Sequence, residues 1–259
     1  MKLIDPTRHP EWLVPHTFEW YQQLGEQKSA YIYPWNSTLE KPNGESIFDE
    51  EVFQMVRNKK VLDVGCGHGE FAIHCSSLAE EIIGFDMTDT FIKMGNENNK
   101  GNVSFVLGNT NDGLPFHADE FDVAYNRKGP TSAYSELKRV VKEGGAILGL
   151  HPGDKAGEEL SEYFPGLFKF SAGTPILDKI TQRLEKSAFA YLNIEVMNST
   201  EYLQTPQDVL KLRCFGQNPK IYAILEKENF PLINQIFEQY ADEKGLPITF
   251  SRYIVRVIV

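Results

Sequence analysis

Cysteine is scarce in this sequence: its 259 residues include only three, and no two of them form a CxxC pair. This usage argues against both a disulfide framework and a structural zinc site. The six histidines also lack an HExxH motif or any comparable set of ligands. We therefore expect the protein to contain no metal.

Long hydrophobic runs are missing as well. The longest apolar stretches are far shorter than the roughly 20 residues that a membrane-spanning helix needs. The first residues, MKLIDPTRHPEW, contain no apolar segment typical of a secretory signal. These two absences predict a protein without membrane association and with a cytoplasmic location.

Positively charged residues are fewer than negatively charged ones: the sequence has 26 Lys and Arg residues and 36 Asp and Glu residues, which gives a net charge of −10. General nucleic-acid binders normally carry a basic field, so this balance argues against that class while allowing a local basic patch. The apolar content of 41% is ordinary for a globular protein. The length fits one large α/β domain or such a domain with an added lid.

The sequence does contain a regular alternation of strand-like and helix-like segments. Five buried strands are predicted at 59–64, 81–87, 102–108, 121–126 and 145–151. Strands that alternate with helices imply a mostly parallel sheet covered on both faces. Further strands are predicted at 191–203 and 248–259, and the last is expected to insert antiparallel beside the others.

Two domains are expected. Residues 1–58 are rich in aromatic residues and proline and are predicted to form an N-terminal helical and aromatic cap or lid. Residues 59–259 are predicted to form the main α/β domain, with helical insertions at about 155–189 and 205–244.

The stretch VLDVGCGHGEF, residues 61–71, carries the main functional signal. An apolar strand runs into three closely spaced glycines, which let a loop approach a nucleotide without Cβ clashes. ATP is excluded because no GxxxxGK[ST] motif is present. The spacing leaves a dinucleotide open, because GHGEFA fits GxGxxA and Asp86 lies 19 residues after Gly67. It leaves S-adenosylmethionine equally open.

Asp63 favours S-adenosylmethionine. A carboxylate at the end of this strand would repel the two charges of a pyrophosphate, whereas S-adenosylmethionine presents an ammonium and a positive sulfonium. The helix that begins near Gly69 could attract the methionine carboxylate. We therefore predict the methyl donor as the cofactor, with a dinucleotide as the alternative.

The same stretch resembles the first motif of class I S-adenosylmethionine-dependent methyltransferases. The likeness continues in order through GFDMT at 84–88, FVLGNTNDGLPF at 105–116, FDVAYNRKG at 121–129 and LKRVVKEGGAILGLHPG at 137–153. The resemblance implies a three-layer Rossmann-like methyltransferase sandwich. Its seven-stranded sheet would have the order 3-2-1-4-5-7-6, with strand 7 antiparallel.

The resemblance also implies roles in donor binding. Asp63 would hold the ammonium group, and Asp86 would accept from the two ribose hydroxyls, which one carboxylate can do with both oxygens. Met87 would lie against the adenine, and Asn109 stands where the family most often has Asp to accept from the adenine amino group. Asp63 and Asp86 could instead cap backbone amides, Met87 could belong to the core, and Thr110 or Asn111 could take the place of Asn109. The full predicted set is Asp63, Gly65, Cys66, Gly67, Gly69, Asp86, Met87, Asn109, Thr110 and Asn126.

The acceptor side is predicted to lie after the fourth strand, where Asn126-Arg127-Lys128-Gly129 occupies the edge at which open α/β sheets bind ligands. This is not the NPPY motif of amino-methylating enzymes, so an amide or adenine methyltransferase loses support. Arg127 and Lys128 could orient an anionic acceptor or form a solvated basic turn.

Three further residues are candidates for the acceptor side. His151, at the end of the fifth strand, could act as a general base because its ordinary pKa suits proton removal near neutrality. A hydrogen-bonded structural histidine is the alternative. Tyr33 and Trp35 could contact the substrate or could belong to the core of the lid.

The predicted reaction is methyl transfer from S-adenosyl-L-methionine to an O, N or C nucleophile, which releases S-adenosyl-L-homocysteine. A small-molecule acceptor is the leading hypothesis. An rRNA or tRNA methyltransferase and a non-catalytic S-adenosylmethionine-binding module are the alternatives. The protein is expected to be a monomer or a homodimer.

Overall fold

The computed structural model describes residues 2–99, 101–169 and 171–259. The chain forms two compact units, each assembled from segments that are distant in the sequence. The first, here called the sheet unit, comprises Gly44–Asp154, Gly173–Met197 and Arg252–Val259. The second, the helical unit, comprises Met1–Asn43, Lys155–Ala172 and Asn198–Ser251. The cap was predicted to end at residue 58, whereas helix α2 (Gly44–Met55) belongs to the sheet unit.

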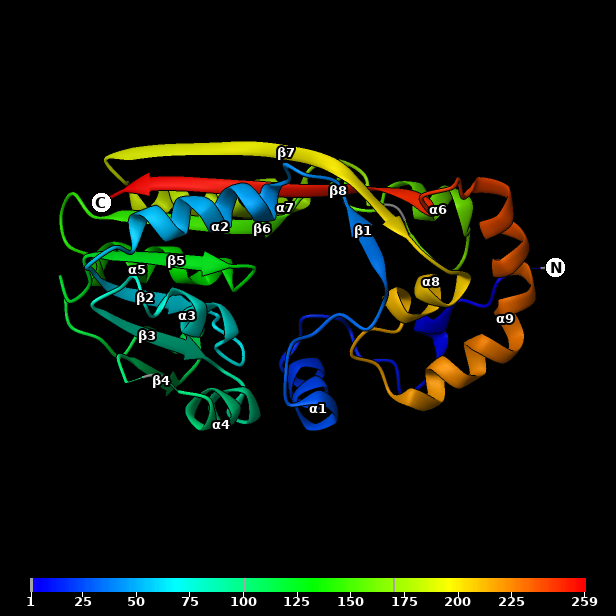
Figure 1. The fold of residues 1–259 in the computed structure, drawn as a ribbon, viewed down its shortest axis with the longest axis horizontal. Helices are drawn as coiled ribbons and strands as arrows, with labels where there is room; N and C mark the ends of the chain where they lie inside the picture. Colours follow the sequence, from blue (N-terminus) through cyan, green and yellow to red (C-terminus); the bar gives the residue numbers. More distant parts are fainter. Residues whose placement is uncertain (1, 100, 170) are drawn as a thin grey trace. The chain divides into compact units, whose positions relative to one another are not determined.

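The sheet unit is built around five parallel strands, which neighbour one another in the order β6-β5-β2-β3-β4. Strand β8 pairs antiparallel with β6, and β7 lies next to β8 (Figure 1). This order and the antiparallel β8 confirm the predicted Rossmann-like methyltransferase fold. The strands are β2 (Lys60–Val64), β3 (Glu81–Asp86), β4 (Val103–Leu107), β5 (Val123–Arg127), β6 (Ala146–Pro152), β7 (Tyr191–Leu203) and β8 (Leu246–Ile258).

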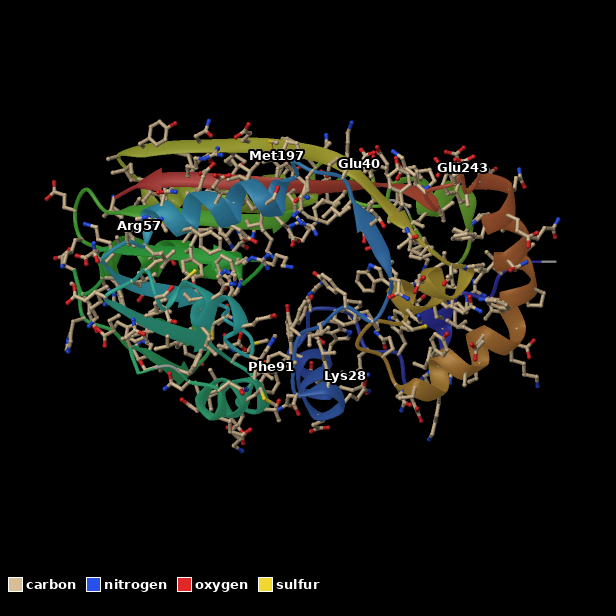
Figure 2. All side chains as sticks on the ribbon, in the orientation of Figure 1. Lys28, Glu40, Arg57, Phe91, Met197 and Glu243 are labelled. Carbon is tan, nitrogen blue, oxygen red and sulfur yellow. The ribbon has the colours of Figure 1, made fainter. Side chains whose placement is uncertain are left out.

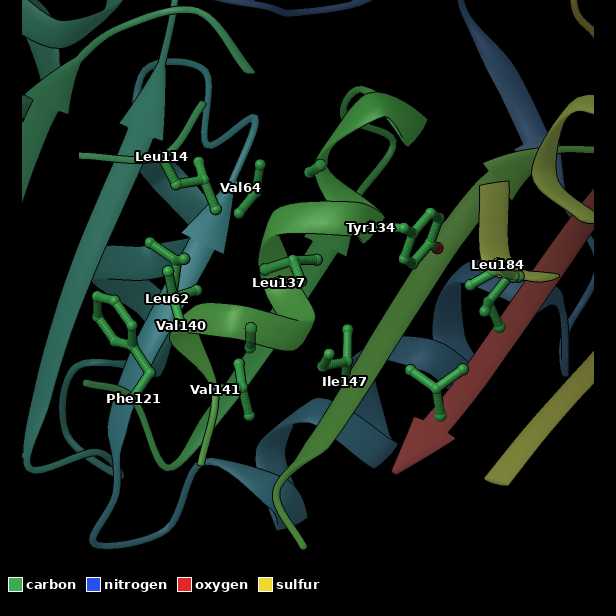
Figure 3. Packing of buried hydrophobic residues seen from close by; sticks show 14 of the residues in the cluster. Leu62, Val64, Leu114, Phe121, Tyr134, Leu137, Val140, Val141, Ile147 and Leu184 are labelled. Carbon is green, nitrogen blue, oxygen red and sulfur yellow. The ribbon is translucent and has the colours of Figure 1, made fainter. Parts of the chain in front are cut away.

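Helices cover both faces of this sheet because successive strand residues point to opposite sides. On one face, Leu62 and Val64 of β2 pack with residues of α5 (Tyr134–Val140) and α7 (Pro175–Ser187), as Figure 3 shows in part. On the other face, Val61 belongs to a second core with residues of α2, α3 (Glu70–Cys75) and α4 (Asp89–Glu97). The parallel strands all end at one edge, and the loops that follow them form the candidate site.

The helical unit has a core of its own, which includes Leu160, Leu210 and Leu225. Its helices are α1 (Phe18–Lys28), α6 (Glu159–Tyr163), α8 (Pro206–Arg213) and α9 (Pro219–Tyr240), together with the short η1 (Pro6–Arg8). Strand β1 (Ser37–Leu39) pairs antiparallel with the end of β7 and makes an eighth strand that the sequence did not predict. No helix in the described part of the chain is long and apolar enough to span a membrane.

Candidate functional site

The glycine loop after β2 is a tight bend held by β3. Gly65, Gly67 and Gly69 all have positive φ angles, of 77°, 56° and 81°. The backbone amides of Gly65 and Cys66 both donate to the carbonyl of Phe85, at 2.8 and 3.2 Å. The Cys66 thiol, whose pKa burial raises well above its ordinary value, packs towards β3. The bend is therefore held against β3 by these contacts.

Asp86 anchors this loop from the end of β3. Its Oδ2 accepts from the backbone amide of Gly67 and its Oδ1 from that of Thr88, both at 2.9 Å. Burial raises the pKa of this carboxyl group, and the backbone hydrogen bonds act in the opposite direction. Each carboxylate oxygen can accept a second hydrogen bond, so Asp86 can hold the loop and still accept from a diol. Met87 follows directly and is half-buried.

Asp63 is the most deeply buried carboxyl group at this edge of the sheet, with 2% of its surface exposed. Its Oδ2 accepts from the hydroxyl of Tyr125 at 3.0 Å, and no described residue donates to its Oδ1. Burial raises the pKa of Asp63 to about 7; the charge of Asp86 acts in the same direction, and the hydrogen bond from Tyr125 and the charge of Arg127 act against it. A cation beside Asp63 would stabilise the ionised form.

Tyr125 did not figure among the predicted site residues. It occupies the position of β5 that pairs in register with Asp63 of β2, so the two side chains share one face of the sheet. The two predicted strands were adjacent in the implied strand order, and their register was the signal that could have identified this pair.

Asn126, at the end of β5, is fully buried. Its Nδ2 donates to the carbonyl of Pro130 at 2.9 Å, whereas its Oδ1 has no hydrogen-bond partner among the described residues. Leaving a buried acceptor unpaired costs about 1–3 kcal/mol. A single donor group on a bound ligand would remove that cost.

Asn109 and Thr110 follow β4 and form a local turn. Asn109 Oδ1 accepts from the backbone amide of Asn111 at 2.9 Å and caps η2 (Thr110–Asp112). The hydroxyl of Thr110 lies 2.8 Å from that of Ser132. Both side chains lie in the loop that follows β4, and both are engaged within the protein.

These groups fit S-adenosylmethionine better than a dinucleotide. Asp63, Asp86 and Asn126 supply acceptors, which suit an ammonium group and a ribose diol. A diphosphate would instead add negative charge to a region in which Asp63 and Asp86 already raise the cost of ionisation. Within residues 2–99, 101–169 and 171–259, no cluster of three or more His, Cys, Asp or Glu residues could hold a metal ion.

The two predicted basic residues after β5 are paired with carboxylates of α2. Arg127 binds Asp49 with Nε at 2.8 Å and Nη2 at 3.0 Å from its two oxygens. Lys128 Nζ lies 3.3 Å from Glu45 Oε1, and Arg252 Nη2 lies 2.9 Å from the same atom. Although burial opposes it, the surrounding cations hold the pKa of Glu45 at about 2. The charges of Arg127 and Lys128 are therefore largely balanced within the protein.

Glu45→Gln is expected to destabilise the protein in a pH-dependent way. The pKa of Glu45 is about 2 in the folded protein against an ordinary value of 4.5, so its ionisation stabilises the fold above pH 4.5. The shift corresponds to about 3 kcal/mol in the free energy of unfolding. Urea unfolding should show this loss at pH 7. The difference in the free energy of unfolding between Glu45→Gln and the wild type should shrink as the pH falls towards 2. Glu50→Gln, at an exposed position of the same helix, should cost less than about 0.5 kcal/mol.

His151 is buried, with 2% of its surface exposed. Its Nε2 lies 2.7 Å from the hydroxyl of Tyr134. Burial, with a contribution from the charge of Arg183, lowers the pKa of His151 to about 3, so the imidazole is neutral at pH 7. A neutral ring can accept a proton in principle, but Nε2 is already engaged with Tyr134. The predicted role as a general base remains a prediction.

Tyr33 and Trp35 lie in the helical unit. Their rings stack with centroids 4.4 Å apart, and both meet the ring of Phe215 edge-on. Trp35 Nε1 donates to Glu201 at 3.0 Å. The two residues thus belong to an aromatic cluster with Trp20, Tyr31 and Phe215. Their contact with substrate remains a prediction.

A mostly parallel sheet in this strand order, with a glycine bend after its first parallel strand and an acidic residue after the second, defines the class I S-adenosylmethionine-dependent methyltransferases. The sequence profile of a family described as "Methyltransferase domain" matches residues 56–227. The chain therefore belongs to this methyltransferase family.

Two relatives and one solved structure illustrate the range of similar proteins. The chain is 30% identical over 156 residues to demethylmenaquinone methyltransferase of Staphylococcus carnosus. This match covers 53% of this chain and 64% of that protein. It is 33% identical over 107 residues to tRNA U34 carboxymethyltransferase of Campylobacter hominis, which covers 37% of each protein. The matches therefore span less than two thirds of either relative. A functionally unknown protein from Deinococcus radiodurans shares the fold, with a TM-score of 0.63 at 18% identity over 93% of this chain and 97% of its own.

Proposed function

We propose that the protein binds S-adenosyl-L-methionine at the ends of β2, β3 and β5 and transfers its methyl group to a small-molecule acceptor. The observation that carries this proposal is the buried carboxyl group of Asp63 and the half-buried carboxyl group of Asp86, on either side of a glycine bend that Asp86 holds through Gly67. In the proposal, Asp63 faces the ammonium group, Asp86 faces the ribose hydroxyls, and the unpaired Oδ1 of Asn126 accepts from a donor group of the cofactor. Met87 faces the adenine, and Asn109 or Thr110 faces its amino group.

The bound donor would supply a methyl group on a positively charged sulfur, which is a good leaving group. No covalent intermediate with the protein is then required. The contribution of the chain is to hold donor and acceptor in line and to exclude water. His151 and Arg127 are the candidates for assisting the acceptor.

A small-molecule acceptor is favoured by the net charge of −10 and by the similarity to a demethylmenaquinone methyltransferase. The similarity to a tRNA-modifying enzyme supports RNA as the second candidate. A homocysteine-release assay against a metabolite panel and total RNA separates the two. Release with metabolites supports the proposal, release with RNA alone replaces the acceptor class, and binding of the donor without release from either pool favours a non-catalytic module.

Asp86→Asn is expected to weaken binding of S-adenosylhomocysteine about 30-fold, or about 2 kcal/mol. An amide at this position would turn a donor towards Gly67 or Thr88 and lose one acceptor for the ribose. Isothermal titration calorimetry measures both proteins. Asp89→Asn, at an exposed carboxylate three residues further on, should leave the affinity unchanged. Binding of NADH in place of S-adenosylhomocysteine would overturn the cofactor assignment.

A further inference from the structure

Arg183, on α7, is a half-buried cation without a carboxylate partner among the described residues. Its Nη1 donates to the hydroxyl of Thr131. Burial lowers the pKa of Arg183, although an arginine remains charged at neutral pH. This contrasts with Arg127 and Lys128, whose charges are balanced by Asp49 and Glu45. The sequence did not single out Arg183, because it lies in a segment predicted only to be helical.

Arg183 reaches the same edge of the sheet as the glycine loop. Thr131 opens η3 (Thr131–Ala133) directly after Pro130. Pro130 in turn packs against the glycine bend, since a Cβ added at Gly65 would lie 2.8 Å from its Cδ. The carbonyl of Pro130 also accepts from Asn126. Thr131, the partner of Arg183, is therefore the residue next to Pro130, which itself contacts the candidate donor site.

The groups that the structure ties to this guanidinium are polar and uncharged. The Thr131 hydroxyl accepts from it, and its charge helps to lower the pKa of His151, whose neutral ring is hydrogen-bonded to Tyr134. Partly desolvating a cation without a counter-ion is unfavourable. One N–H of Arg183 is used by Thr131, and the other N–H groups of a guanidinium, which has five in all, can serve a ligand. A planar pair of N–H donors matches a carboxylate, which it can bind with two parallel hydrogen bonds.

We propose that Arg183 binds a carboxylate group of the methyl acceptor and so selects carboxylate-bearing small molecules. This inference rests on the proposed methyltransferase function and adds the substrate class. A singly charged carboxylate matches the single charge of Arg183. A phosphate would bring a second negative charge, which the uncharged side chains of Thr131, Tyr134 and His151 cannot balance. The competing explanation is that Arg183 only ties α7 to η3.

Acetate is the probe, because a subsite that admits the carboxylate of a larger acceptor also admits acetate. The arginine Nε–Hε signals of ¹⁵N-labelled protein, saturated with S-adenosylhomocysteine, are followed while acetate replaces chloride at constant ionic strength. The Arg183 signal is assigned by its loss in Arg183→Gln. Arg57, which is labelled in Figure 2, is the internal control, because it is exposed and binds only Gln54 among the described residues.

We expect acetate to shift the Arg183 signal in a saturable way, with a dissociation constant at least tenfold lower than at Arg57. Acetamide should cause no such shift. Thr131→Val, which keeps the charge but removes the tie to η3, should retain acetate binding. In Arg183→Gln, the acetate-dependent shift of the Thr131 backbone amide should disappear.

Equal affinities at Arg183 and Arg57 would overturn the proposal. The proposal would also be overturned if Thr131→Val lost acetate binding as completely as Arg183→Gln does. That result would indicate that Arg183 only ties α7 to η3. Inorganic phosphate binding at least tenfold more tightly than acetate would overturn the carboxylate class. Binding of S-adenosylhomocysteine is measured in the same sample by calorimetry, and its failure would count against the proposed function and not against Arg183.

Discussion

Asp63→Asn is expected to raise the melting temperature of the ligand-free protein above pH 7 and to weaken binding of S-adenosylhomocysteine about 100-fold. The first effect follows from burial. The pKa of Asp63 is about 7 in the folded protein against an ordinary value of 3.8, so ionisation at high pH opposes folding. The shift corresponds to about 4 kcal/mol when the group is ionised in both states. The amide keeps an acceptor for Tyr125 and carries no charge.

The pH dependence has a definite sign. A carboxyl group whose pKa is raised on folding stabilises the folded state fully below its unfolded pKa, and this contribution is lost as the pH rises through the folded value. The difference in melting temperature between Asp63→Asn and the wild type should therefore be small at pH 4, grow between pH 4 and 7, and level off above. Thermal unfolding followed by circular dichroism over this range measures it.

Asp122→Asn provides a control of opposite sign. Asp122 accepts from Lys142 Nζ at 2.6 Å and from the backbone amide of Lys60 at 2.8 Å, and its pKa is lowered. Its replacement should lower the melting temperature at neutral pH and leave donor affinity unchanged. If Asp63→Asn were instead less stable than the wild type at pH 8, the carboxylate would have a stabilising partner, and its proposed role for a ligand cation would lose its basis.

Donor binding should also release protons near neutrality. An ammonium group beside Asp63 lowers the pKa of the carboxyl group, so a site that is partly protonated at pH 6.5 becomes ionised on binding. Calorimetric titrations in two buffers with different ionisation enthalpies report the number of protons released. Asp63→Asn should abolish this release while Asp122→Asn retains it, which ties the affinity loss to the ionisable group.

The sequence predicted the fold well because its signals are local. Each of the five parallel strands is a short apolar run followed by a turn, and such a run can be recognised without knowing its neighbours. Strand β1 escaped prediction because its three residues, Ser37–Leu39, are too few to show a period. The positions of Asp63 and Asp86 could be predicted for the same reason, since each lies at or next to the end of a strand.

The partners of the site residues could not be predicted in this way. Arg127 meets Asp49 across 78 residues of sequence, and Arg183 meets Thr131 across 52. Such pairings depend on how helices pack against the sheet, and helix periodicity does not specify which charged side chain faces which loop. The basic turn after β5 illustrates this: the sequence left open whether Arg127 and Lys128 orient an anionic acceptor or form a solvated turn, and it did not indicate that both pair with carboxylates of α2.

Gly69→Ala is expected to destabilise the protein by about 3–4 kcal/mol. Two costs combine at this position. The φ angle of +81° lies in the left-handed region, where a Cβ costs about 1–2 kcal/mol. In addition, the new Cβ would lie 2.3 Å from Cζ of Phe105. That ring is packed in the core, and a Cβ added at Gly84 or Gly95 would also lie 2.7 or 3.1 Å from it, so it has little room to move away.

Gly144→Ala separates the two costs, because Gly144 has a similar φ of +76° and no described residue lies within 4 Å of the place that its Cβ would occupy. Gly144→Ala should therefore lower the free energy of unfolding only by the cost of the positive φ angle, about 1–2 kcal/mol. Adding Phe105→Leu to Gly69→Ala should make the combined loss smaller than the sum of the two single losses, because the smaller side chain relieves the overlap. Urea unfolding of the wild type, the two single variants and the double variant completes the cycle. Equal losses at Gly69 and Gly144 would mean that the ring of Phe105 does not confine the loop, and that the fold requires glycine at position 69 for its φ angle alone.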